Sequence, residues 1–163
     1  NMAMAPTLDE LRDLHKRSTY YVIQTLLKGD SRPLGAWLYS KDSNPGTEPL
    51  DSQDILAVFV KRDGSPESAL IAMATLARSY LVAGGAKRSA LAARGVPLPR
   101  AIVLVAPPHK AAEGEVVKTF VLTEHQTFLA ESPVLEGGKT VRLGDLELLE
   151  VSLTHNRRPG KFN

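Results

Sequence analysis

Residues 8–27 alternate hydrophobic and polar positions with the period of an amphipathic α-helix. One face of this helix is predicted to collect residues spaced by three, four or seven positions: Leu8, Leu11, Leu14, Tyr21 and Thr25. The helix is expected to begin with a capping box, in which Thr7 caps free backbone donors and Glu10 reaches back to the capping residue. Gly29 and then Pro33 are expected to end it.

Three short apolar runs predict β-strands at residues 34–39, 55–60 and 100–106. The second and third are nearly continuous runs of β-forming residues, which is typical of strands that are buried on both faces. Residues 40–53 are rich in Pro, Gly and polar side chains, and we expect an exposed loop there.

An Ala- and Leu-rich segment at residues 67–82 predicts a second helix, which opens at Ser65 or Pro66. Its core-facing side is expected to consist of Leu70, Met73, either Leu76 or Ala77, and Tyr80. A Gly-Gly pair interrupts this pattern, and a shorter helical piece is predicted at residues 87–94. Since these helices join two buried strands, we expect a right-handed crossover and a parallel strand pair.

From Glu115 onward the hydrophobic and polar residues alternate, which predicts antiparallel strands and hairpins. Within this region, Gly137-Gly138-Lys139-Thr140 spells the end of a phosphate-binding loop, G-x-x-x-x-G-K-[ST]. The first glycine of that motif is missing, because Pro133 stands in its place, and a strand pattern follows where a helix is required. We therefore predict a two-stranded hairpin with its tip at Gly137-Gly138.

Together these elements predict a single domain of the α/β or α+β class. It has a mixed sheet, a helical crossover between two buried strands and a strand-rich C-terminal hairpin region. The globular domain is expected to cover residues 1–155, and residues 156–163 are expected to form a basic, flexible tail. A chain of 163 residues is long enough to bury a substantial core as one domain.

Composition narrows the possible functions. The absence of cysteine excludes a disulfide scaffold, a Cys-ligated zinc site and a cysteine nucleophile. The chain has 20 basic and 18 acidic residues, so its net charge is small. Any binding to nucleic acid must therefore depend on a local basic patch. No apolar run approaches the roughly 20 residues of a membrane span, and the first residues lack the features of a signal peptide. We therefore expect an intracellular protein that does not enter a membrane.

The histidines provide no clear catalytic or metal-binding pattern. They stand at positions 15, 109, 125 and 155, and no two have the i, i+4 spacing of a helical metal pair. Glu124 and His125 are adjacent on a predicted strand, so their side chains are expected to point to opposite faces. His109 is the best candidate for an active-site residue, because it follows a buried strand and α/β sites lie at the carboxyl ends of strands.

Several enzyme classes lack their required residues. There is neither a G-x-S-x-G nucleophile elbow nor a Rossmann glycine fingerprint. A restriction-type nuclease needs a second acid after one such as Asp54, but Phe59 stands where that acid is required. We expect neither a metal site nor a cofactor, and no catalytic residue is assigned.

Basic residues form the one candidate binding site. They lie between the second helix and the third strand and again in the tail: Lys87, Arg88, Arg94, Arg100, Arg157, Arg158 and Lys161. Such residues are compatible with a solvated surface and a soluble tail, or with non-specific, salt-sensitive contacts to nucleic-acid phosphates. No aromatic residues interleave with them, so a stacking platform for single strands is not expected.

The order of strand and helix motifs resembles the jaw domain of the fifth shared subunit of nuclear RNA polymerases. The similarity covers most of residues 8–128 and depends on four segments: the helix 8–27, "DILAVFV" at 54–60, "RAIVLV" at 100–105 and "FVLTEH" at 120–125. The chain differs from the family in three places. The family's separate C-terminal assembly domain has no counterpart in this sequence, so an isolated or divergent jaw module is expected. A predicted helix replaces the jaw's second strand after Asp63, and the gap before "LTEH" is shorter.

This resemblance implies a structural role, in which the domain clamps downstream DNA and contacts regulators in the nucleus. We therefore predict a non-enzymatic interaction module of a nucleic-acid-associated assembly. Its partners are expected to be other protein subunits, with duplex nucleic acid as a further partner of the basic patch. Two alternatives stay open: a small enzyme with a site near His109, and an adaptor that binds protein through its C-terminal strands.

Overall fold

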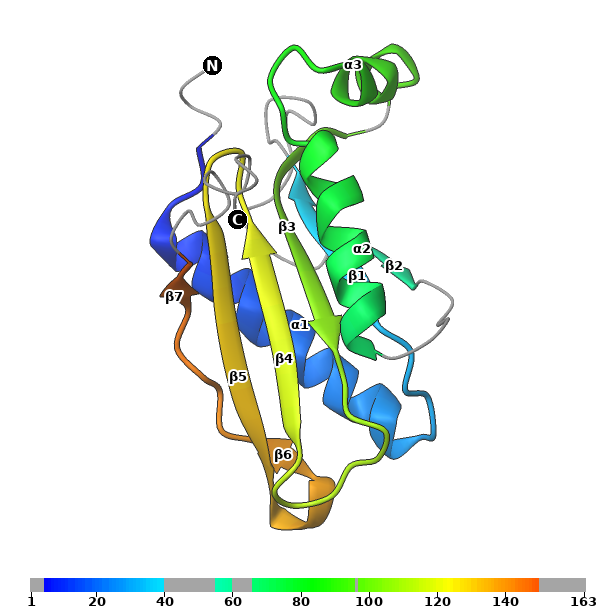
Figure 1. Cartoon of the computed structure of the whole chain (residues 1–163), viewed down its shortest axis with the longest axis vertical. Coiled ribbons are helices and arrows are strands. Elements are labelled where there is room, and N and C mark those ends of the chain that lie inside the picture. The colour runs from blue at the N-terminus through cyan, green and yellow to red at the C-terminus, as the bar shows by residue number, and fades with distance from the viewer. Residues whose placement is uncertain (1–4, 40–54, 60–65, 96, 150–163) are drawn as a thin grey trace, which may run out of the picture.

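The computed structural model describes residues 5–39, 55–59, 66–95 and 97–149, and Figure 1 shows helices on both faces of one β-sheet. The elements are α1 (Leu8–Leu27), β1 (Leu34–Tyr39), β2 (Ile55–Phe59), α2 (Pro66–Ser79), α3 (Ala86–Ala93), β3 (Pro99–Ala106), β4 (Val116–Leu122), β5 (Thr127–Leu135), β6 (Thr140–Val141) and β7 (Glu147–Leu148). The prediction of one domain with helices and strands is confirmed, and its class is α+β.

The strands are ordered β2-β1-β3-β4-β5-β6. Strand β6 pairs with the last residues of β5, and β7 pairs with the first part of the same strand. All pairings among the described strands are antiparallel. The predicted parallel pair is wrong, because β1 lies between the two strands that the helices join. Ala36 of β1 faces Ala57 of β2 on one side and Val103 of β3 on the other. Strands β2 and β3 therefore run in the same direction without touching, and no mixed sheet forms among the described strands.

Strand β3 is buried on both faces, as its continuous apolar sequence predicted. Ala101, Val103 and Val105 belong to the core beneath α1. The alternate residues Ile102, Leu104 and Ala106 belong to a second core beneath α2. Figure 1 shows the two helices on opposite sides of the sheet. The side chains of β2 are outside the described residues, so only its predicted strand conformation is confirmed.

Helix α1 has the predicted boundaries and capping box. The Glu10 amide donates to the Thr7 hydroxyl at 3.1 Å, and the Thr7 amide donates to the Glu10 carboxylate at 2.9 Å. Its buried face differs from the predicted one, since Leu8 and Tyr21 are exposed. The 3.6-residue period instead turns three polar residues toward the sheet: His15, Ser18 and Thr19.

Helices α2 and α3 also form where they were predicted. On α2, Ala77 is buried against the sheet while Leu76 is exposed, which decides between the two candidates. Met73 and Tyr80 pack against the same core. Gly95 follows α3 with a φ of 72°, the left-handed exit expected after a helix.

The C-terminal hairpin is confirmed, and its tip is at the glycine pair. Val134 and Leu135 of β5 pair with Val141 and Thr140 of β6. Gly137 and Gly138 have φ values of 66° and 96°, which L side chains rarely adopt. Strand β6 follows the Gly-Gly-Lys sequence at once, so the helix N-terminus of a phosphate loop is not formed.

Some predictions fall outside the described residues. These are the exposed loop 40–53, the basic tail 156–163 and the ends of the proposed domain 1–155. Among the helices that are described, none is both long enough and apolar enough to cross a membrane.

Candidate functional site

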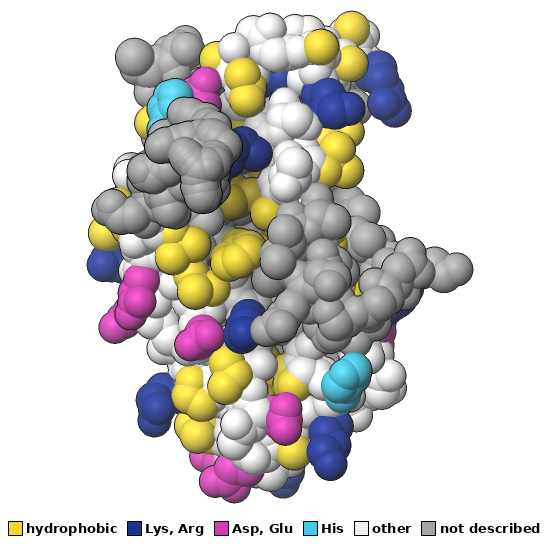
Figure 2. All heavy atoms as spheres, in the orientation of Figure 1, with side chains coloured by type: hydrophobic (Ala, Val, Ile, Leu, Met, Phe, Trp, Pro, Cys, Tyr) yellow, Lys and Arg dark blue, Asp and Glu magenta, His cyan; other side chains and the backbone are white. Residues whose placement is uncertain are grey.

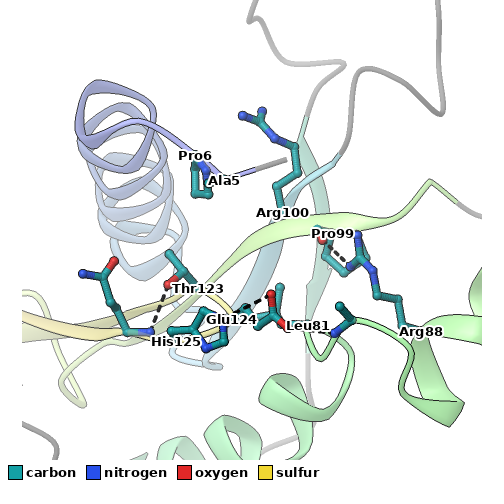
Figure 3. A pocket seen from close by; sticks show the side chains of 11 residues that line it. Ala5, Pro6, Leu81, Arg88, Pro99, Arg100, Thr123, Glu124 and His125 are labelled. Carbon is teal, nitrogen blue, oxygen red and sulfur yellow. Dashed lines mark hydrogen bonds and ion pairs between the residues drawn. The ribbon is translucent and has the colours of Figure 1, made fainter. Parts of the chain in front are cut away.

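A hollow of about 680 Å³ lies at the end of the sheet where β3 begins and β4 turns into β5 (Figure 3). The N-terminal segment, the residues after α2, helix α3 and the β4–β5 turn all contribute to its lining. Its polar side chains include Arg88, Arg100, Glu124 and His125. Elements distant in the sequence thus place four ionisable side chains around one concave surface.

The β4–β5 turn, residues 123–126, is held by its own hydrogen bonds and by Arg78. The Thr123 amide donates to the Gln126 carbonyl at 2.9 Å, and the Gln126 amide donates to the Thr123 hydroxyl at 3.0 Å. The Arg78 guanidinium donates to the carbonyls of Thr123, Glu124 and Gln126 at 2.9, 3.1 and 3.2 Å, and also to the Thr127 hydroxyl. Burial lowers the pKa of Arg78. The turn is therefore fixed to α2 through a partly desolvated cation.

Glu124 and His125 are close together, so the prediction that they face opposite sides is wrong. They lie in a turn and not in a strand, and the side-chain alternation of a strand does not apply to them. Glu124 Oε1 is 3.5 Å from His125 Nε2, while Glu124 Oε2 accepts a hydrogen bond from the Ala83 amide at 2.9 Å. His125 is 83% exposed, so this contact adds little stability.

Arg88 is anchored in the hollow by carbonyl groups. Its Nη1 donates to the carbonyls of Pro99 at 2.6 Å and Tyr80 at 3.3 Å. Burial lowers the pKa of Arg88, and the negative charge of Glu124 opposes part of this effect. Within the described residues, Arg88 Nε and Nη2 make no hydrogen bond. The Nη1 side of the guanidinium is therefore fixed, while the Nε–Nη2 edge has no hydrogen-bond partner among the described residues.

Arg100, a predicted phosphate-binding residue, forms an internal ion pair. Its guanidinium donates to the Glu10 carboxylate at 2.7 and 3.1 Å, and the two side chains are 8% and 19% exposed. Figure 3 shows the Arg100 guanidinium directed away from Arg88. Since Glu10 also belongs to the capping box, the pair joins the start of α1 to the start of β3. Its role is structural.

The other predicted binding residues divide into two groups. Lys87 and Arg94 are exposed at α3, and Lys87 Nζ lies 5.7 Å from the centre of the Tyr80 ring. Figure 2 shows Lys and Arg side chains gathered at the end of the molecule that carries α3. The remaining predicted residues lie outside the described part of the chain: Arg157, Arg158 and Lys161.

The alternative active-site residue, His109, is exposed and lies beyond the C-terminal end of β3. The 680 Å³ hollow is at the N-terminal end of that strand and does not include it. Neither the role of Arg78 nor the position of Glu124 was predicted from the sequence. One local signal was available, because Thr123 opens a polar four-residue stretch of the kind that forms side-chain-capped turns.

A second hollow of about 420 Å³ lies between α1 and residues 143–148. The buried His15 links these two segments, with its Nε2 2.9 Å from the Gly144 carbonyl oxygen and its Nδ1 3.2 Å from the Thr19 hydroxyl. Because a carbonyl only accepts, Nε2 carries the proton and Nδ1 accepts from Thr19. Burial lowers the pKa of His15, which favours this neutral form. His15 therefore has a structural role.

Neither hollow resembles a metal centre. Among the side chains that the structure describes, no three His, Asp or Glu residues are close enough together to hold a metal ion. No family model, curated protein or solved structure matches this chain. Its function must therefore be inferred from the arrangement of its own residues.

Proposed function

We propose that this chain is a non-enzymatic interaction module of a nucleic-acid-associated assembly, with a role like that of a polymerase jaw. The proposal depends chiefly on one observation: no Asp or Glu occurs between residues 80 and 112, while this region carries several cations. Helix α3 lies within it, at one end of the molecule beyond the end of α2 (Figure 1). It presents Lys87 and Arg94 to solvent.

Contacts between these cations and phosphates would be independent of base sequence and sensitive to salt. Arg88 and Arg100 are bonded internally. Of the four described candidate residues, Lys87 and Arg94 are therefore the two that can direct their whole charged group toward phosphates. Each neutralised phosphate changes the slope of log K against log salt by about −0.9 on duplex DNA. The α3 surface is therefore expected to contribute a slope of about −2, whereas all four cations together would contribute nearly twice as much.

This proposal can be tested by fluorescence anisotropy with a labelled DNA duplex over a series of salt concentrations. We expect the double variant Lys87→Gln/Arg94→Gln to bind more weakly and to lose about two units of slope. Lys139→Gln is the matched control, because Lys139 is exposed at the hairpin tip, at the opposite end of the molecule. An absence of DNA binding at low salt, or equal losses in both variants, would refute the proposal.

The protein partners require a separate experiment. If the chain is a jaw-like module, affinity purification from its native source should recover polymerase subunits together with the chain. The double variant should still recover them if α3 contacts only nucleic acid. Recovery of unrelated proteins would favour the adaptor alternative instead.

A further inference from the structure

We propose that the 680 Å³ hollow binds a small oxyanion, a phosphate or carboxylate group, through the free edge of the Arg88 guanidinium. Arg88 lines this hollow and, within the part of the chain that the structure describes, is bonded through Nη1 alone. The Nε–Nη2 edge presents parallel N–H donors, the geometry that binds phosphate and carboxylate oxygens in pairs. Arg88 belongs to α3, but its side chain lines the hollow, whereas the nucleic-acid contacts of the proposed function are made by Lys87 and Arg94.

Arg78 provides an internal comparison for Arg88. Both residues are partly buried at the same end of the sheet, and both use backbone carbonyls as acceptors. Arg78 donates through both terminal nitrogens to four oxygens around the turn. Arg88 donates through one nitrogen to two oxygens, although it too has lost part of its hydration. An anion in the hollow would supply the charge-assisted hydrogen bonds that Arg88 lacks.

The described charges at this end of the sheet sum to a net positive charge, although Arg78 lies outside the lining of the hollow and the negative charge of Glu124 acts on Arg88. The Arg100 charge is compensated by Glu10, and the Arg78 and Arg88 cations are hydrogen-bonded mainly to neutral carbonyls. Among the described residues of the lining, Glu124 is the one acid, and its two oxygens are directed to the Ala83 amide and to His125. His125 stands at the rim, where its ring can provide a further donor.

The dimensions suit a small-molecule ligand. A volume of about 680 Å³ falls within the usual range of roughly 300–1,000 Å³ for ligand pockets. Arg88 is held at two carbonyls before any ligand arrives, so binding does not have to order its side chain. The preorganised donor edge is expected to fix the oxyanion, while the rest of the hollow surrounds the group attached to it.

The test is an NMR titration of the full ¹⁵N-labelled chain with inorganic phosphate and, separately, with acetate. We expect a saturable shift of the Arg88 Nε–H resonance with at least one of them, and the ion that binds more tightly identifies the ligand class. Arg88→Gln should weaken binding at least about tenfold, since charge-assisted hydrogen bonds are lost. Lys139→Gln, at an exposed cation outside both the hollow and α3, should leave the affinity unchanged.

Thermal unfolding of both variants shows whether they remain folded, because Arg88 also bonds Pro99 and Tyr80. If Arg88→Gln does not fold, the Nε–H titration of the unmodified chain still decides the question. The proposal is overturned if neither anion shifts this resonance in a saturable way, or if Lys139→Gln loses as much affinity as Arg88→Gln. Since Arg88→Gln should retain DNA binding, failure here and failure of the proposed function are separable.

Discussion

Replacing Gly138 by alanine tests why the sequence places two glycines at the hairpin tip. A Cβ atom on Gly138 would lie 2.1 Å from the carbonyl oxygen of Ala111 and 2.8 Å from its carbonyl carbon. Carbon–oxygen contacts in proteins are rarely shorter than about 3.3 Å. The backbone at Ala111 would therefore have to move by more than an ångström. Gly137 has a similar positive φ but has no neighbouring atom within 4 Å, which makes Gly137→Ala the matched control.

The expected costs follow from these two environments. An alanine at Gly137 carries only the left-handed backbone penalty of about 1–2 kcal/mol. An alanine at Gly138 carries a similar penalty plus about 1–3 kcal/mol for overpacking against a backbone that cannot move freely. The Ala111 segment is restrained because the adjacent Gly114 and Glu115 hydrogen-bond to Val134 of β5. We expect Gly138→Ala to lower the free energy of unfolding by roughly 2 kcal/mol more than Gly137→Ala does.

Urea unfolding, followed by circular dichroism, measures both free energies. Thermal unfolding provides a second measurement, since 1 kcal/mol corresponds to about 2–4 °C in a chain of this size. The midpoint of Gly138→Ala is then expected to lie roughly 4–8 °C below that of Gly137→Ala. Equal losses in the two variants would show that the close approach of Ala111 does not matter.

Three further predictions concern the polar residues that connect the elements. Arg100→Met removes the guanidinium from its largely buried ion pair with Glu10 and is expected to cost about 3 kcal/mol. The exposed Arg94→Met should change stability by less than about 0.5 kcal/mol, and urea unfolding compares the two. Arg78→Lys replaces a guanidinium that holds three turn carbonyls, so the amides of the β4–β5 turn should exchange with solvent more than about tenfold faster. Unchanged exchange would show that Arg78 does not fix the turn. Burial lowers the pKa of His15, so its contribution to stability is fully present above the unfolded value of about 6.5. That contribution is lost as the pH falls toward the folded pKa, because the unfolded chain then binds the proton first. His15→Gln should reduce the slope of unfolding free energy against pH between pH 8 and about 5, measured by urea unfolding at each pH.

The local elements could be predicted because the signals that define them are local. The capping box of α1 depends on two residues three positions apart, and both hydrogen bonds form as expected. The glycine pair and the alternation around it were enough to predict the β5–β6 hairpin. The continuous apolar run of β3 predicted burial on both faces, since a strand with one solvated face alternates instead.

The candidate site was predicted poorly, because it depends on contacts between distant residues. Arg100 looks like a surface cation in the sequence, yet its acidic partner is 90 positions away. Glu124 and His125 were assigned to a strand, but they lie in the β4–β5 turn. Arg78 of α2 binds the carbonyls of this turn, and no residue adjacent to Glu124 and His125 in the sequence indicates that contact. Lys87 and Arg94 are exposed as expected, because no element of the described chain covers that side of α3.

The order of the strands shows most clearly that contacts between distant residues are not predicted from local sequence signals. Hydrophobic pattern, caps and turn residues are read over a few positions, so they predict where each helix and strand begins and ends. They do not predict which strands become neighbours, because pairing depends on how well whole surfaces pack once the helices cover the sheet. Strand β1 therefore lies between β2 and β3 and converts the expected parallel pair into two antiparallel pairings. The same long-range packing brings Arg88 and the β4–β5 turn to one hollow.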